Sequence, residues 1–91
     1  MVEKIIVSVM GRDKVGIIAA TTRTLSEANV NILDISQTIM QDYFAMILVA
    51  DISNCRVTFA ELKENLKETG ESIGMQINTQ RAEIFDFMHR I

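Results

Sequence analysis

The sequence predicts an α+β domain in which a four-stranded antiparallel sheet carries two helices on one face. Four segments of the chain are predicted as strands, and apolar residues alternate at period two in the first and the last of them. Two segments between them have apolar residues at helical spacing instead. The segments follow the order strand, helix, strand, strand, helix, strand. Two strand–helix–strand units in this order fold into one sheet, so we expect a ferredoxin-like sandwich.

The first unit begins with a strand and continues into a helix through a turn that contains glycine. Ile5, Val7 and Val9 alternate with their neighbours and indicate a strand, which residues 11–14 are expected to end. Helical spacing follows over residues 15–28, and Asn29 is a plausible left-handed stop. Asp13 or Lys14 is expected to mark the start of the helix, and the following residues are predicted to form its apolar stripe: Ile18, Thr22, Leu25 and Ala28.

Two further strands are predicted over residues 31–40 and 43–52, joined by a tight turn at Gln41 and Asp42. The second of these strands is apolar on both faces, with Phe44, Met46, Leu48 and Ala50 on one and Ala45, Ile47 and Val49 on the other. A strand with one face in water would alternate, so we expect a central strand with both faces covered, one of them by a partner subunit.

The second helix is predicted from Phe59 to about Gly70, with Leu62 and Leu66 on its apolar side. A strand over residues 73–80 then alternates cleanly and has one wet face. A terminal helix is expected at about 81–90, with an apolar stripe formed by Ile84, Phe87, Met88 and Ile91. Such a helix docks either on its own domain or in a groove of a second subunit, and the sequence leaves both open.

The chain of 91 residues is one domain, with its core expected at about residues 3–80. A net charge of −3 argues against a general nucleic-acid binder. The single cysteine, Cys55, excludes an intrachain disulfide and a multi-cysteine metal site, and we expect no cofactor. No stretch has the length of a membrane span and no signal-peptide block is present, so a cytoplasmic location is expected.

Several functions hosted by this kind of sheet are disfavoured. RNA recognition needs exposed aromatic residues on the central strands, and only Tyr43 and Phe44 occur there, at one strand's start. A copper carrier needs paired cysteines in the first loop. An acylphosphatase-like role for Arg12 and Asn31 is opposed by Asp13, which would repel an anionic substrate. With one terminal histidine and no paired carboxylates, we do not expect an enzyme.

The first loop and the start of the second strand carry the strongest functional pattern. The loop reads Gly11-Arg12-Asp13-Lys14-Val15-Gly16-Ile17, and a second segment reads Asn29-Val30-Asn31-Ile32-Leu33-Asp34-Ile35. We expect the glycine turn, the helix N-terminus and the two asparagines to lie near one another. This arrangement suits the binding of a small polar molecule, because Gly16 permits close approach and helix amides attract a carboxylate.

These segments resemble those of the ACT domain, a small regulatory ligand-binding module. The resemblance includes the Asp-x-x-Gly turn, with Val15 at the usual proline position, and the Asn-Ile that opens the second strand. It covers about residues 3–80. The run Asp34-Ile35-Ser36-Gln37-Thr38 and the pair Ile84-Phe85 are similar to those of stand-alone bacterial and archaeal ACT proteins of uncharacterised function.

The resemblance implies a homodimer that binds an amino acid or a similar metabolite at the subunit interface, without catalysis. A zwitterion would fit Asp13 for its ammonium group and the helix amides for its carboxylate. The candidate ligand-binding residues lie in the loop, the first helical turn and the second strand's start: Arg12, Asp13, Lys14, Val15, Gly16, Ile17, Ile18, Asn29, Asn31 and Ile32.

Purely structural interpretations of the same residues remain open. The role of Asp13 could be limited to capping the first helix, and that of Gly16 to permitting close packing of that helix on the sheet. Asn29 and Asn31 could serve as a helix stop and a strand-entry hydrogen bond. Arg12 and Lys14 could simply be solvated. The alternative function is then a protein–protein interaction module without a small-molecule ligand.

Overall fold

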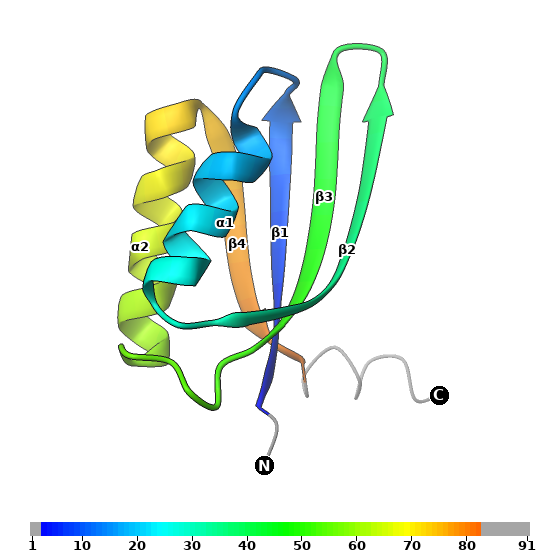
Figure 1. Cartoon of the computed structure of the whole chain (residues 1–91). Coiled ribbons are helices and arrows are strands. Elements are labelled where there is room, and N and C mark those ends of the chain that lie inside the picture. Colours follow the sequence, from blue (N-terminus) through cyan, green and yellow to red (C-terminus); the bar gives the residue numbers. More distant parts are fainter. Residues whose placement is uncertain (1–2, 83–91) are drawn as a thin grey trace.

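The computed structural model describes residues 3–82 and contains the six predicted elements in the predicted order (Figure 1). The strands are β1 (Lys4–Arg12), β2 (Asn31–Met40), β3 (Tyr43–Asp51) and β4 (Met75–Arg81), and the helices are α1 (Ile17–Glu27) and α2 (Phe59–Ile73). The strands pair antiparallel in the order β2-β3-β1-β4. The prediction of a ferredoxin-like α+β sandwich is therefore confirmed.

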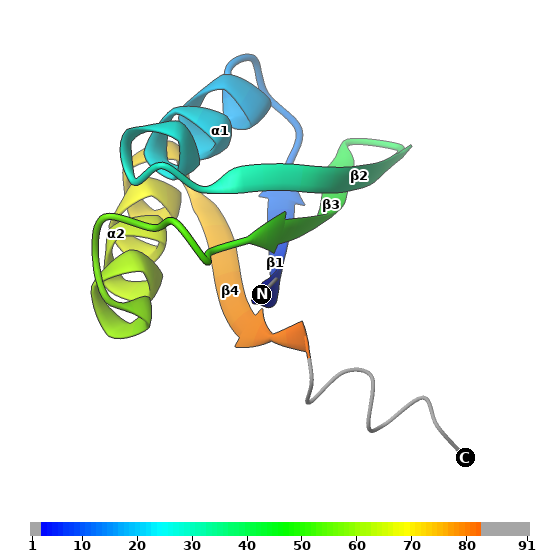
Figure 2. The same ribbon diagram turned by 60° about the horizontal axis from the view of Figure 1, so that its bottom comes forward.

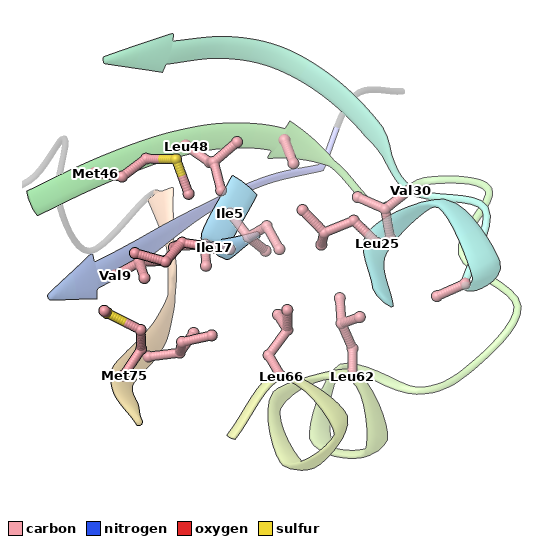
Figure 3. Close-up of a cluster of buried hydrophobic side chains, with 14 of the residues drawn as sticks. Ile5, Val9, Ile17, Leu25, Val30, Met46, Leu48, Leu62, Leu66 and Met75 are labelled. Atoms are coloured by element: carbon pink, nitrogen blue, oxygen red, sulfur yellow. The ribbon is translucent and has the colours of Figure 1, made fainter. Parts of the chain in front are cut away.

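Both helices lie on the same face of the sheet, and the core fills the space between these two layers (Figures 1 and 2). Period-two alternation places Ile5, Val7 and Val9 of β1 in this core, where each is fully buried. Leu62 and Leu66 of α2, four residues apart on one side of the helix, point toward the buried side chains of the sheet (Figure 3). Burying such side chains is the main stabilising term for a domain of this size.

The beginning of α1 differs from the prediction. β1 does not end at Gly11 but continues to Arg12, because it stays paired with the start of β3. The helix begins at Ile17 and not at Asp13 or Lys14. Its buried residues are Ile17, Thr21 and Leu25, followed by Ala28, so the first two members of the predicted stripe are each replaced by the residue before them. Ile18, predicted in the stripe, is 38% exposed, and Thr22 is half-buried.

The end of α2 also differs, because the helix runs through Gly70 to Ile73. Gly70 is buried inside the helix, where a Cβ would lie 2.7 Å from the carbonyl oxygen of Met75. Its missing side chain lets α2 approach β4 closely, so this glycine permits packing and does not stop the helix. The stop is Gly74, in the left-handed conformation, and Ile73 belongs to α2 and not to the strand.

The face of the sheet opposite the helices is uncovered in the described part of the chain. β3 is central, as predicted, and Phe44, Met46 and Leu48 are buried beneath the helices. On the other face of β3, Ile47 remains 51% exposed. The prediction that both faces of β3 are covered therefore holds for one face only within residues 3–82. The predicted terminal helix lies outside the described residues from 83 onwards.

The edge strand β2 is exposed along nearly its whole length. A bulge between Ile32 and Asp34 shifts its register on β3 by one residue. After the bulge, Ile35 and Ile39 share the helix side of the sheet, opposite Leu48 and Phe44, yet the helices do not cover them and both are exposed (Figure 1). An edge strand with open backbone groups and uncovered apolar side chains is suited to contact another chain.

Candidate functional site

The N-terminus of α1 is open. Its N-cap is Gly16, in the left-handed conformation with φ 93° and ψ 0°, and no side chain forms a capping hydrogen bond. The first turn contains no acidic residue. The interpretation of Asp13 as the helix cap is therefore wrong. The first amides of a helix have no partner within the helix, so those after Gly16 can donate hydrogen bonds to an external acceptor such as a carboxylate.

Gly16 is required by the backbone and not by packing. A Cβ added at this position would have no heavy atom within 4 Å, so the glycine does not serve close packing on the sheet. Its positive φ is a conformation that residues with a side chain rarely adopt. The space in front of Gly16 is open, and a small molecule can approach the backbone there.

The two basic residues of the loop have partners. The Arg12 guanidinium pairs with the Asp42 carboxylate at 2.8 Å and lies 5.9 Å from the centre of the Tyr43 ring. The Asp13 backbone N–H donates to the Asp42 carbonyl oxygen at 2.8 Å, which ties the loop to the β2–β3 turn. The Lys14 ammonium lies 3.0 Å from where a Cβ of Gly74 would be, at the C-terminal end of α2. Its charge there complements the helix dipole.

The tip of the loop presents apolar side chains to the outside. Val15, at the position where ACT sequences carry proline, is fully exposed. Ile18 in the first turn of α1 is also exposed, whereas Ile17 is buried in the core. Ile17 therefore positions the loop from beneath, and Val15 and Ile18 are available to contact a ligand or another chain.

The asparagines mark the other end of α1. Asn29 follows the helix in the left-handed conformation, with φ 61°, and its side-chain amide donates to the Asn54 carbonyl oxygen at 2.9 Å. This supports its interpretation as a helix stop. Asn31 opens β2 beside Asp51 of β3, and its exposed side chain makes no hydrogen bond to another residue within 3–82. The neighbouring Ile32 is half-buried.

Two open hollows flank Asn31. One has a volume of about 610 Å³ and runs between the outer side of α1 and the start of β2, lined by Ala19, Thr22, Arg23, Ser26, Asn29, Val30, Asn31 and Ile32. The other, of about 270 Å³, lies between the start of β2 and the end of β3, lined by Asn29, Val30, Asn31, Asp51, Ser53 and Asn54. Arg23 lines the first hollow and Asp51 lines the second. Neither residue was predicted from the sequence to belong to the site.

Asp51 is held by backbone amides. Its carboxylate Oδ1 accepts hydrogen bonds from the Ser53 N–H at 2.9 Å and the Glu3 N–H at 3.1 Å. The hydrogen bond from the Ser53 backbone, and a weaker one from Glu3, lower the pKa of the Asp51 carboxyl below its ordinary value. The group is therefore ionised over the physiological range, and it places a negative charge next to Asn31.

The loop and the asparagines lie at opposite ends of α1 (Figure 1). The helix spans 11 residues, which at 1.5 Å per residue separates its ends by about 16 Å. An amino acid is much shorter than this. The prediction that these groups lie near one another is therefore wrong within a single copy of the chain, because the residues between them form one uninterrupted helix.

Residues 3–82 contain no group of three or more His, Cys, Asp and Glu side chains placed to hold a metal ion. Among the same residues, no helix is long and apolar enough to cross a membrane.

Comparisons with known proteins agree with the pattern in the loop and the second strand. The family model of the ACT domain matches residues 3–80. A UPF0237 protein of Methanocaldococcus jannaschii is 52% identical over 88 residues, which cover 97% of this chain and 98% of that protein. Its counterpart in Clostridium acetobutylicum is 49% identical over 97% of this chain and 99% of its own length. The solved ACT domain protein from Streptococcus pneumoniae superposes with a TM-score of 0.81 at 36% identity, covering 93% of this chain and 96% of that one.

Proposed function

Because the chain belongs to the ACT domain family, whose members are regulatory and typically bind ligands, we propose that it binds a small molecule between two copies of itself. The ligand is an amino acid or a similar small carboxylate, and the domain is a non-catalytic sensor. The observation that carries this proposal is the open N-terminus of α1, where no side chain caps the helix and a Cβ on Gly16 would have no heavy atom within 4 Å.

The carboxylate of the ligand binds at this helix start. The amides of the first turn carry partial positive charge and point out of the helix, which favours an anion. The Asp13 side chain forms no cap, so it is available to accept a hydrogen bond from a ligand ammonium group. These two groups match the two charges of an α-amino acid.

The second copy of the chain completes the site. Asn31 lies beyond the far end of α1, whose 11 residues span about 16 Å, so it reaches a ligand at the loop only from a partner. A two-fold axis between two copies would bring each loop to the other copy's Asn31 and create two equal sites. The exposed apolar residues of the loop tip and of β2 supply a surface for this contact: Val15, Ile18, Leu33, Ile35, Ile39 and Met40.

Isothermal titration calorimetry with each of the twenty amino acids tests the proposal. We expect one or a few of them to bind, and Asn31→Ala to abolish that binding without changing the thermal unfolding midpoint, since Asn31 is exposed and makes no hydrogen bond to other described residues. Asn65→Ala on the exposed side of α2 is the matched control and should leave binding intact. No binding by any of the twenty, or unchanged binding in Asn31→Ala, would contradict the proposal.

A second candidate function is an assembly module that takes no small ligand. It is favoured by the uncovered apolar face of the sheet, where Met10 of β1 and Ile47 of β3 are each about half exposed. Calorimetry separates the two candidates. A ligand sensor still binds an amino acid when this face is altered, whereas an assembly module binds none.

A further inference from the structure

The uncovered face of the sheet carries one apolar stripe between two polar rows. The stripe consists of Ile6 and Met10 of β1 with Ala45, Ile47 and Val49 of β3, and Ser8 lies at its centre. The register pairs Ile6 with Val49, Ser8 with Ile47 and Met10 with Ala45, so the two strands form one continuous surface.

Polar residues bound the stripe on both sides. β4 contributes Gln76, Asn78 and Gln80, each paired with a β1 residue of the same face. β2 contributes Asp34, Ser36 and Thr38, each paired with a β3 residue of that face. The apolar surface is therefore two strands wide, or about 10 Å at the usual strand spacing, which equals the diameter of a single helix with side chains.

The length of the stripe also fits one short helix. From Ile6 to Met10 the strand rises by about 13 Å. A helix formed by residues 83–91 would be about 13 Å long. These residues lie outside the described part of the chain, and their sequence places apolar residues at helical spacing: Ile84, Phe87, Met88 and Ile91.

The way in which the described chain ends indicates whether the terminal segment covers the stripe of its own copy or that of another copy. β4 ends at Arg81, and Ala82 is already helical and buried. A chain that reverses from a strand to a helix lying back over the same sheet needs a connection of about two or more residues. No such connection precedes Ala82, so a helix that continued directly from it would not be able to turn back over its own stripe.

We propose that residues 83–91 of one copy dock on the apolar stripe of a second copy, and that the two copies exchange these segments reciprocally. The exchange is isologous, because each copy gives one segment and receives one. This exchange would cover the face of the sheet that the helices leave open, and it would bury the apolar stripe and the apolar residues of the terminal segment against each other. This assigns a surface that the proposed ligand site does not use, since that site lies at the two ends of α1.

Disulfide trapping in the full chain tests this inference. With Cys55→Ser to remove the native thiol, Ile47→Cys at the centre of the stripe is combined with Phe87→Cys at the centre of the terminal segment. Mild oxidation is expected to give a disulfide-linked dimer on a non-reducing gel, with peptide mapping that joins positions 47 and 87. Adding Met88→Asp should lower the yield severalfold, because a carboxylate would be placed against the apolar stripe.

The control pair keeps Phe87→Cys but moves the second cysteine to Lys63→Cys, on the exposed side of α2, and should give no specific link. Each variant is used only if its thermal unfolding midpoint matches that of the Cys55→Ser parent. A 47–87 disulfide within single chains would show docking on the same copy and overturn the exchange, and so would the absence of any 47–87 link. Calorimetry with amino acids on the same variants reports separately on the ligand site.

Discussion

The two helices of this domain begin in opposite ways. At the start of α2, the Thr58 hydroxyl accepts the Glu61 backbone N–H at 3.1 Å, and the Glu61 carboxylate accepts the Thr58 N–H at 3.3 Å, which forms a complete capping box. At the start of α1, Gly16 stands at the N-cap, and no side chain accepts a hydrogen bond from the first amides.

This difference separates stability from binding. The chain is able to cap a helix with its own side chains, as α2 shows, and such a cap contributes about 1 kcal/mol. At α1 the equivalent amides have no side-chain cap, and the space around the Cβ position of Gly16 is open. A start without a cap is a local cost to stability, and it leaves donors for an acceptor that comes from outside the chain.

The largest effect is expected at the glycine of the open start. Gly16→Val should destabilise the domain by about 2 kcal/mol, because a β-branched residue is strained at φ 93°. Urea unfolding followed by circular dichroism measures this loss. Gly16→Asn is the matched control and should lose less, since asparagine tolerates positive φ. Equal losses in the two variants would show that strain is not the cause.

Breaking the capping box of α2 should have the next largest effect. Thr58→Ala removes the side-chain acceptor of the Glu61 N–H and should cost about 1 kcal/mol in the free energy of unfolding. The same urea titration measures it, and Thr58→Ser, which keeps the hydroxyl, should recover most of the loss. A Thr58→Ala protein as stable as the parent would remove the contrast between the two helix starts.

Asp13 should behave differently from Thr58. Asp13→Ala is expected to change the free energy of unfolding by less than about 0.5 kcal/mol, because the side chain is exposed and caps no helix. Its backbone N–H still donates to the Asp42 carbonyl oxygen in the variant. A loss as large as that of Thr58→Ala would show that Asp13 caps α1 after all.

Asp51 provides a case in which a carboxylate of the chain itself holds backbone amides. Its folded-state pKa is lowered, chiefly by the Ser53 backbone hydrogen bond, so its contribution to stability is full above the unfolded pKa. That contribution is lost as the pH falls through the folded pKa, below 3.8. The effect is expected to be small, because the group is open to solvent.

Urea midpoints at pH 5 and pH 3 measure this pH dependence. Asp51→Asn should reduce the loss of stability between pH 5 and pH 3, because the variant lacks the carboxyl that titrates there. An Asp51→Asn profile that falls as steeply as the parent's would rule out the assignment.

Most of the fold could be predicted because it depends on periodicity. Ile5, Val7 and Val9 alternate in the sequence and are buried together in the structure, since a pleated strand presents every second residue to one face. One of the errors arose at a glycine. Gly70 looks like a helix stop but lies inside α2, because its contact with β4 involves residues that only the fold brings together.

The candidate site was harder to predict for the same reason. Sequence proximity suggested that the loop and Asn31 would meet, but a helix of 11 residues holds them apart. Asp51 and Arg23 flank Asn31 only after β3 pairs with β2 and α1 packs beside them. A pairing partner across a sheet leaves no short-range pattern in the sequence, so these residues resembled ordinary surface charges.

In the proposed site, one ligand joins the open start of α1 in one copy to Asn31 in another. Titration of the ¹⁵N-labelled full chain with the amino acid that calorimetry identifies tests it directly through backbone amide shifts. We expect the amides of Ile17 and Ile18 and that of Asn31 to shift together, with one dissociation constant. Shifts confined to one end of α1, or different dissociation constants at its two ends, would contradict the shared site.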